Sequence, residues 1–206
     1  ILFGFVIAHM LGNLQVFLGR EHLNAYGAML HSMPKALWAA RIVLLVSVVT
    51  HIRLTVALTM QNRAARPTRY RMQADGVAQS PLERYARKTM ILSGLVLFAF
   101  IAFHLAHLTV GANVVPGYAF KEGDVYSNVV HGFRVPWVTG FYVVANVLLG
   151  MHLFHGSHSF LQSLGLRGSS SVDRIRNLAI AFAVLVTLGN VSMPLLIVAR
   201  VVGGAE

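Results

Sequence analysis

The sequence predicts an all-α membrane protein with five transmembrane helices. Of its 206 residues, 56% are hydrophobic and only 12% are charged, about half the charged fraction of a soluble domain. The apolar residues gather in five long runs without the alternation that marks strands. A helix needs about 20 residues to cross a bilayer and satisfies its backbone hydrogen bonds within one segment. We therefore treat residues 1–206 as a single transmembrane domain.

The five runs define the expected spans in order. The sequence starts without Met, inside the first run, so we expect further residues before Ile1. Pro34 and Pro136 stand at the start of the second and fourth runs, and proline is favoured in a first helical turn. We expect spans at residues 1–17, 35–60, 87–110, 136–161 and 175–202.

The charges predict the orientation of the chain. There are 17 Lys and Arg residues against 7 Asp and Glu, and the formal net charge is +10. The basic side chains lie mostly between the apolar runs, which favours cytoplasmic loops over a nucleic-acid surface, so we expect no nucleic acid. Arginines gather between spans two and three and between spans four and five. This bias predicts a cytoplasmic N-terminus and a C-terminus outside the cell.

Four of the five runs carry a histidine, and a histidine inside a membrane span is costly and usually functional. With a rise of about 1.5 Å per residue, depth can be compared between spans. His51 and His152 both fall about 25 Å from the outer side, in the inner half. His9 and His104 both fall in the outer half. Each pair comes from alternate spans, so the first four helices could form a bundle, with the fifth, which has no histidine, peripheral.

Two imidazoles facing each other across a helix bundle are what a six-coordinate haem iron needs. The depth sorting therefore predicts two b haems, one in the outer and one in the inner half of the membrane. The chain has no cysteine, which excludes thiolate-held iron–sulfur clusters and covalent c-type haem on this polypeptide. The alternative is that the four histidines bond to neighbouring helices and hold no cofactor.

Five stretches are distinctive: HMLGN, GREHLNAYGAMLHSMP, THIRLTVALT, SGLVLFAFIAFHLAHL and GFYVVANVLLGMHLFHGSHSFLQSLG. They resemble a known family, the dihaem cytochrome b membrane anchor of succinate dehydrogenase and fumarate reductase, in its single-polypeptide, five-helix type. The resemblance covers nearly the whole chain and is least in the last span. In that family the first and third spans hold the distal haem, and the second and fourth hold the proximal haem.

The resemblance implies the function and the partners. A flavoprotein subunit would oxidise succinate, a step of the tricarboxylic acid cycle, and an iron–sulfur subunit would relay the electrons. This chain would anchor both in the bacterial inner membrane and pass electrons through two b haems to quinone, menaquinone in this family type. Two alternatives stay open: a haem b subunit of a hydrogenase or formate dehydrogenase, and a haem-free transporter or anchor.

His107 is a rival to His104, because it follows by three residues and shares much of the same helix face. The ten-residue spacing from Gly94 to His104 is similar to the family's spacing. The resemblance therefore favours His104 as the ligand.

Further candidates surround the four histidines. Arg41 and Arg53 lie in the second span, where a guanidinium either pairs with an anion such as a haem propionate or extends to the lipid headgroups. One branch of the family has a glutamate near the outer end of this span that serves menaquinol. No glutamate lies there, and His31 and Glu21 are the nearest candidates for proton exchange with a quinone. His155, one turn past the fourth-span ligand, is a third.

One departure from the family concerns proton transfer. The same branch has a glutamate two residues before the histidine of the fourth span, and this chain has Gly150 there. We therefore expect this chain to lack a proton pathway through the fourth span. Compensating proton transfer through that span during quinone reduction would contradict this expectation.

Overall fold

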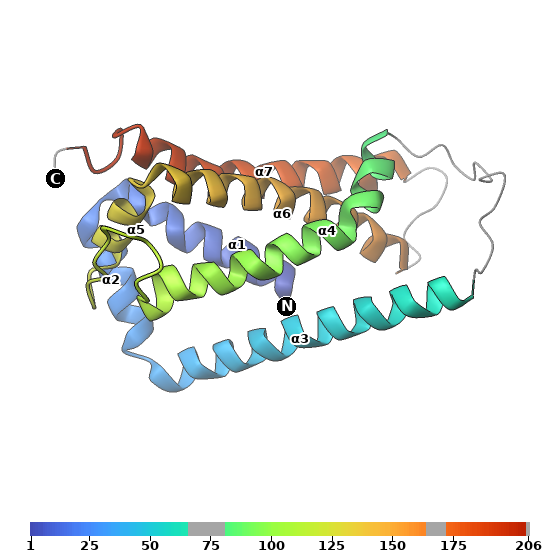
Figure 1. Ribbon diagram of the computed structural model, residues 1–206, viewed down its shortest axis with the longest axis horizontal. Helices are drawn as coiled ribbons and strands as arrows, with labels where there is room; N and C mark the ends of the chain where they lie inside the picture. The colour runs from blue at the N-terminus through green and yellow to red at the C-terminus, as the bar shows by residue number, and fades with distance from the viewer. Residues whose placement is uncertain (66–80, 164–171, 205–206) are drawn as a thin grey trace.

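The structure, a computed structural model, describes residues 1–65, 81–163 and 172–204. All regular secondary structure in these ranges is helical (Figure 1). Two short elements extend longer helices: η1 follows α1 as a 3₁₀ helix, and η2 follows α4 as a π-helix. The elements are α1 Leu2–Asn13, η1 Leu14–Leu18, α2 Arg20–His31, α3 Pro34–Ala64, α4 Pro81–Leu105, η2 Ala106–Val110, α5 Val125–Phe133, α6 Pro136–Ser163 and α7 Val172–Val198.

Four helical segments are long and apolar enough to cross a membrane, as expected of a multi-pass membrane protein. The predicted proline starts are confirmed, because α3 begins at Pro34 and α6 at Pro136. The first apolar helix, Leu2–Leu18, is shorter than the others, so the fifth crossing stays a prediction. The four segments are Pro34–Ala64, Thr89–Val110, Pro136–Leu161 and Asp173–Val198.

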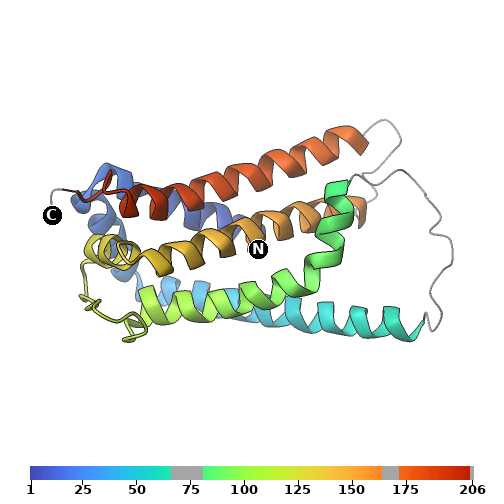
Figure 2. The ribbon, with the colours of Figure 1, turned by 45° about the horizontal axis from the view of Figure 1, so that its top comes forward.

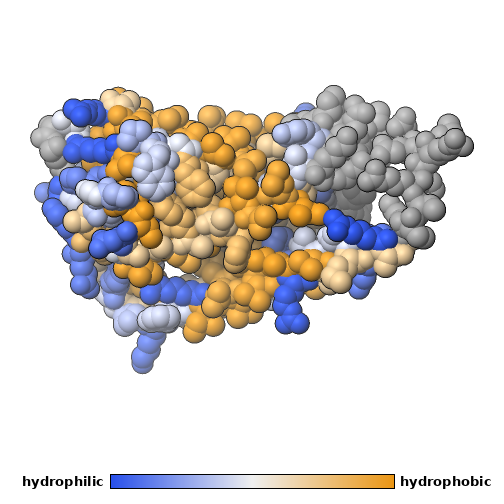
Figure 3. Space-filling model, in the orientation of Figure 1, coloured by the Kyte–Doolittle hydropathy of each residue, from blue (hydrophilic) through white to orange (hydrophobic). Residues whose placement is uncertain are grey.

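The two ends of the molecule differ. The short helices α2 and α5 and the C-terminus gather at one end, where α4 finishes and α3 and α6 start (Figures 1 and 2). We call this the α2/α5 end, and it is the end that the charge pattern predicts to lie outside the cell. Apolar side chains cover the middle of the molecule, whereas hydrophilic ones collect at the α2/α5 end (Figure 3). The apolar middle fits a lipid bilayer.

The largest buried cluster also lies towards the α2/α5 end. It joins η1, α2, α5 and the neighbouring ends of α6 and α7, so the short helices pack as a cap on the long ones. Two smaller clusters, one around Met10, Leu153 and Val186 and the other around Phe154 and Ala179, hold α7 on α6 and α1. The large cluster consists of Val16, Leu23, Val115, Tyr118, Tyr126, Val130, Phe133, Val138, Tyr142, Met193 and Ile197.

The packing of α3 and α7 corrects one expectation. We expected the last span to be peripheral to a bundle formed by the first four. The structure places α7 and α3 on opposite sides of the molecule (Figures 1 and 2). α7 buries Ala183, Val186 and Ile197, whereas α3 buries no residue. The least packed of the long helices is therefore α3. An apolar helix tolerates this in a membrane, because lipid or a ligand can cover the side chains that no other helix covers.

A polar junction ties α2 to α5. Arg20 forms an ion pair of 2.7 Å with Asp124, and the Asn24 side-chain amide donates to the same carboxylate over 3.0 Å. Asp124 also caps α5, accepting from the Ser127 backbone N–H at 3.1 Å. Burial raises the pKa of Asp124, but the hydrogen bonds from Asn24 and Ser127 and the charge of Arg20 outweigh it and lower the pKa to about 2. Asp124 thus stays ionised and holds the junction together.

Replacing Asp124 with Ala is expected to cost about 1 kcal/mol of stability, since the α5 cap and its partners are lost together. Asp124→Asn keeps a capping oxygen and loses only the ion pair, so it should cost less. Because the folded pKa is depressed from 3.8, the stabilisation is present above about pH 4 and is lost as the pH falls towards 2. Thermal unfolding in detergent at several pH values measures both effects. Equal unfolding midpoints for the Ala variant and the wild type would contradict the assignment.

Candidate functional site

The predicted outer pair lies side by side between α1 and α4. The ring centroids of His9 and His104 are 5.6 Å apart, with the ring planes at 89°. His9 stacks on Phe5 of its own helix, with centroids 5.2 Å apart, and is exposed on the surface of the chain. His104 has Phe100 beside it at 5.8 Å. Aromatic neighbours thus limit the orientation of both imidazoles while one edge of His9 stays open.

The predicted inner pair lies between α3 and α6. The ring centroids of His51 and His152 are 6.0 Å apart, with the planes at 73°. His152 Nδ1 lies 3.4 Å from Ser93 Oγ, whose own proton goes to the Met90 carbonyl at 3.0 Å. When Ser93 donates to that carbonyl it accepts from His152, an arrangement that has the proton on Nδ1 and leaves Nε2 with its lone pair.

The two pairs occupy different levels of the bundle. His152 lies beside Ser93, which precedes His104 on α4 by about three turns. At about 1.5 Å per residue this separates the two levels by about 16 Å along the helices. Each pair is thus a separate site, and the His104 pair is the one nearer the α2/α5 end.

The spacing within each pair fits two imidazoles that share one iron. A ligating imidazole nitrogen lies about 2 Å from a first-row metal and about 1 Å from its own ring centroid, so opposite ligands have centroids about 6 Å apart. The observed 5.6 Å and 6.0 Å are close to this value. Within the described ranges, no three His, Asp or Glu side chains converge to hold a bare metal ion. Two imidazoles suit a metal whose remaining ligands come from a macrocycle, as in haem.

The sparse packing of α3 also fits a group larger than an amino acid side chain. His51 is exposed in the chain although it faces His152, and every residue of α3 keeps some accessible surface. In the space-filling view a hollow separates part of α3 from the helices beside it (Figure 3). On α4, even a Cβ added at Gly94 would make only ordinary van der Waals contact with the His152 ring, at 3.9 Å. The residues around the inner pair therefore leave room beside the imidazoles.

His107, the rival to His104, lies in a different environment. It is fully buried in the π-helix η2, and its Nδ1 is 3.1 Å from the Tyr142 hydroxyl. Its Nε2 faces the backbone of α5, where a Cβ added at Gly132 would come within 2.6 Å of it. No metal could approach this nitrogen without moving α5. The geometry therefore favours His104 over His107, as the spacing from Gly94 does.

No protein-family model, curated protein or solved structure matches this chain. The assignment of the site thus depends on its own geometry and on the resemblance noted in the sequence.

The two arginine candidates have different surroundings. The Arg41 guanidinium lies over the ring of Trp38, 5.1 Å from the centroid, one turn away on the same helix. Arg53 is exposed, close to His51 on α3. Arg53 follows His51 by two residues, so its side chain leaves α3 about 200° from the imidazole. Arg41 contacts an aromatic ring at the membrane edge, as interfacial cations often do.

The three quinone candidates lie at two different ends. His31 and Glu21 are exposed on α2, at the α2/α5 end, and His31 Nδ1 donates to the Gly27 carbonyl over 2.8 Å. His155 is on α6 beyond His152, 3.4 Å from Ser159 Oγ. The structure does not gather these three into one site.

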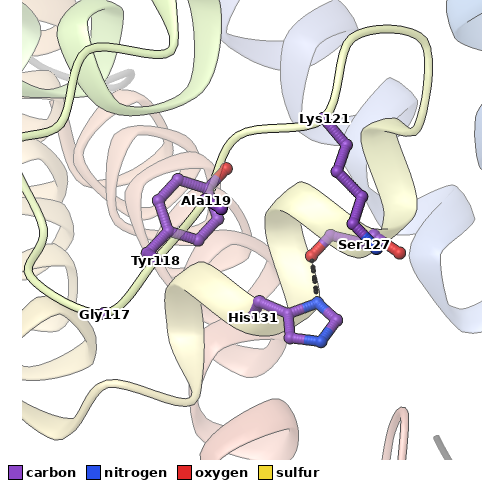
Figure 4. A pocket seen from close by; sticks show the side chains of 6 residues that line it. All are labelled: Gly117, Tyr118, Ala119, Lys121, Ser127 and His131. Atoms are coloured by element: carbon purple, nitrogen blue, oxygen red, sulfur yellow. Dashed lines mark hydrogen bonds between the residues drawn. The ribbon is translucent and has the colours of Figure 1, made fainter.

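A small cavity at the α2/α5 end was not predicted. It measures about 190 Å³, and its lining comes from the loop before α5 and from α5 itself (Figure 4). His131 Nδ1 donates to the Ser127 carbonyl at 2.8 Å across its floor. Burial raises the pKa of Tyr118, which also lines it, to about 12, so its hydroxyl stays protonated. The lining residues are Gly117, Tyr118, Ala119, Lys121, Ser127 and His131.

Sequence reasoning also missed Tyr142 and Ser93, the hydrogen-bond partners of His104 and His152. Neither lies next to its histidine in the sequence, because each contact crosses from α4 to α6. Partners of this kind orient a ligating imidazole and raise its basicity. No spacing rule within a single helix could have found them.

Proposed function

We propose that this chain is the membrane anchor and electron-transfer subunit of a succinate:quinone oxidoreductase. The observation that carries the proposal is the pairing of four histidines from four apolar helices, two by two, at two levels of the bundle. One pair of neighbouring histidines alone would also suit ordinary helix packing. Two pairs at ligand spacing, in a chain that resembles the dihaem anchor along nearly its whole length, support the electron-transfer role.

Each histidine has a defined task in this proposal. His9 and His104 would hold the outer haem b, and His51 and His152 the inner one. All four would act as neutral imidazoles with the Nε2 lone pair directed at the iron, and Ser93 keeps His152 in that tautomer. When bound, haem supplies reversible one-electron storage inside the membrane. Arg53 is available to offset a propionate charge near the inner pair.

The remaining parts of the proposal follow the charge pattern and the resemblance. Leu2–Leu18 would be the remaining span, with the N-terminus cytoplasmic and the C-terminus outside a bacterial inner membrane. The arginine-rich connections, much of which lies outside the described residues, would face the iron–sulfur subunit, to which the flavoprotein subunit binds. Menaquinone would be the electron acceptor, with His31, Glu21 and His155 as candidates for proton exchange.

The purified complex is expected to contain about two b haems per copy of this chain, because there are two histidine pairs. Pyridine haemochrome analysis, with a dithionite-reduced spectrum, measures this directly. Quinone reduction by the same preparation with succinate, hydrogen and formate in turn identifies the partner enzyme.

The outcomes separate the alternatives. Two haems with turnover on succinate support the proposal in full. Two haems with turnover only on hydrogen or formate would keep the electron-transfer role and replace the succinate partner. A preparation with no haem would end the proposal and leave histidines that bond between helices.

A further inference from the structure

The hydroxyl of Tyr142 lies between two histidines in the protein interior. Its Oη is 3.2 Å from His104 Nδ1 and 3.1 Å from His107 Nδ1. The tyrosine is 3% exposed, and Phe100 and Phe133 meet its ring edge-on, with centroids 4.9 Å and 4.7 Å away. The aromatic neighbours hold the ring, so the hydroxyl has a fixed position.

The protons of this group can be counted. A tyrosine hydroxyl has one proton, so it can donate to one Nδ1 and must accept from the other. A neutral imidazole has one N–H. One histidine therefore carries its proton on Nδ1 and has a free Nε2 lone pair, and the other carries its proton on Nε2. The hydrogen bonds to Tyr142 make the two histidines chemically different.

The proposed ligand role of His104 decides which histidine is which. His107 Nε2 is buried against α5, where a Cβ on Gly132 would be 2.6 Å away, and it has no hydrogen-bond partner among the described residues. The ring of His104, in contrast, faces His9. For the Nε2 lone pair of His104 to be free to bind iron, His104 Nδ1–H must donate to Tyr142. The Tyr142 hydroxyl then donates to His107 Nδ1.

We propose that Tyr142 is a positioning residue that fixes the tautomer and orientation of His104 and so tunes the outer haem. The inference rests on the proposed function, since it assumes that His104 ligates an iron. A hydrogen bond donated from Nδ1–H raises the basicity of the ring, which favours ferric over ferrous iron. Without that acceptor His104 is a weaker donor, and the reduction potential of its haem rises.

The test is a redox titration of both haems in the purified complex carrying Tyr142→Phe. We expect the midpoint potential of one haem to rise and that of the other, at the His51 and His152 level, to stay at its wild-type value. Tyr118→Phe is the matched control. It removes a buried hydroxyl that has no hydrogen-bond partner within the described ranges, from a ring whose centroid lies 5.1 Å from that of His107. It should leave both potentials unchanged.

A second variant guards against poor folding of the first. His107→Leu keeps the Tyr142 hydroxyl and removes the group that accepts its proton, so the hydroxyl is a weaker acceptor for His104. We expect a smaller rise in the same haem's potential, with a matching change in its low-spin EPR signal. Loss of that haem alone in Tyr142→Phe would also support a positioning role.

Two kinds of failure can be told apart. A wild-type complex without haem would overturn the proposed function and this inference together. A wild type with two haems, combined with unchanged potentials in both Tyr142→Phe and His107→Leu, would overturn only the role of Tyr142. An equal shift of both haems, or the same shift in Tyr118→Phe, would show a general packing effect and would overturn it as well.

Discussion

A complex that carries His104→Leu is expected to retain one b haem in place of two and to lose most of its succinate-driven quinone reduction. Leucine provides no lone pair, so of the two residues that would hold the outer haem only His9 would remain. The other pair lies about 16 Å away along the bundle, so the remaining haem should keep its spectrum. Haemochrome analysis and the reduced difference spectrum measure both effects.

His107→Leu is the matched control for this experiment. It makes the same change three residues later, in a side chain that is more buried than His104 and bonds to the same tyrosine. It should leave two haems bound. If His107→Leu loses a haem while His104→Leu keeps both, the ligand assignment within this span is wrong. If neither variant loses a haem, the outer pair does not hold one.

Gly150→Glu is expected to destabilise the protein by more than about 3 kcal/mol. Gly150 is buried where α6 packs on α7, and a Cβ there would collide with the Thr187 hydroxyl. That hydroxyl donates to the Ala183 carbonyl at 2.8 Å and could rotate away only by giving up this bond. The larger side chain would also place a carboxylate against an apolar helix.

Two alanine variants separate the steric effect from the charge. Gly150→Ala should cost about 1–3 kcal/mol, because even one methyl group overfills the contact. Gly140→Ala lies on the same helix with nothing within 4 Å of its added Cβ, so it should be neutral or stabilise the helix slightly. Thermal unfolding in detergent compares the three. A Glu variant as stable as the wild type would show that α6 and α7 are not as close as the structure has them.

The positions of the histidines were predictable because depth in a straight helix depends only on the rise per residue and on where the helix starts. Pro34 and Pro136 marked two of those starts, and α3 and α6 begin there. The short helices α2 and α5 were not predicted, because they lie in the polar outer connections, where no long apolar run marks them. Their cap is held by a polar junction that involves residues 100 or more positions apart.

The packing order of the helices could not be predicted for a different reason. Hydropathy is almost the same for α3 and for the spanning part of α7, 2.0 and 2.1. It says that each helix prefers lipid to water and says nothing about which neighbour it interlocks with. The small side chains Ala179 and Ala183 of α7 allow the close approach to α6. Such small residues are the one feature of the sequence that could have indicated this packing. Tyr142 could not be found at all, since its two contacts exist only after α4 and α6 pack together.

The exposed surface of α3 has a consequence for how its register is set. No side chain of α3 is buried against another helix, so packing specifies its rotation about its axis and its height only weakly. The turn after α2 joins it at one end only, and His51 lies about 25 Å beyond that joint. Inserting one residue between Pro34 and His51 would turn the imidazole by about 100° away from His152 while displacing no buried residue of α3. The contact between His51 and His152 would therefore set the register of α3, which interlocking side chains set for the other long helices.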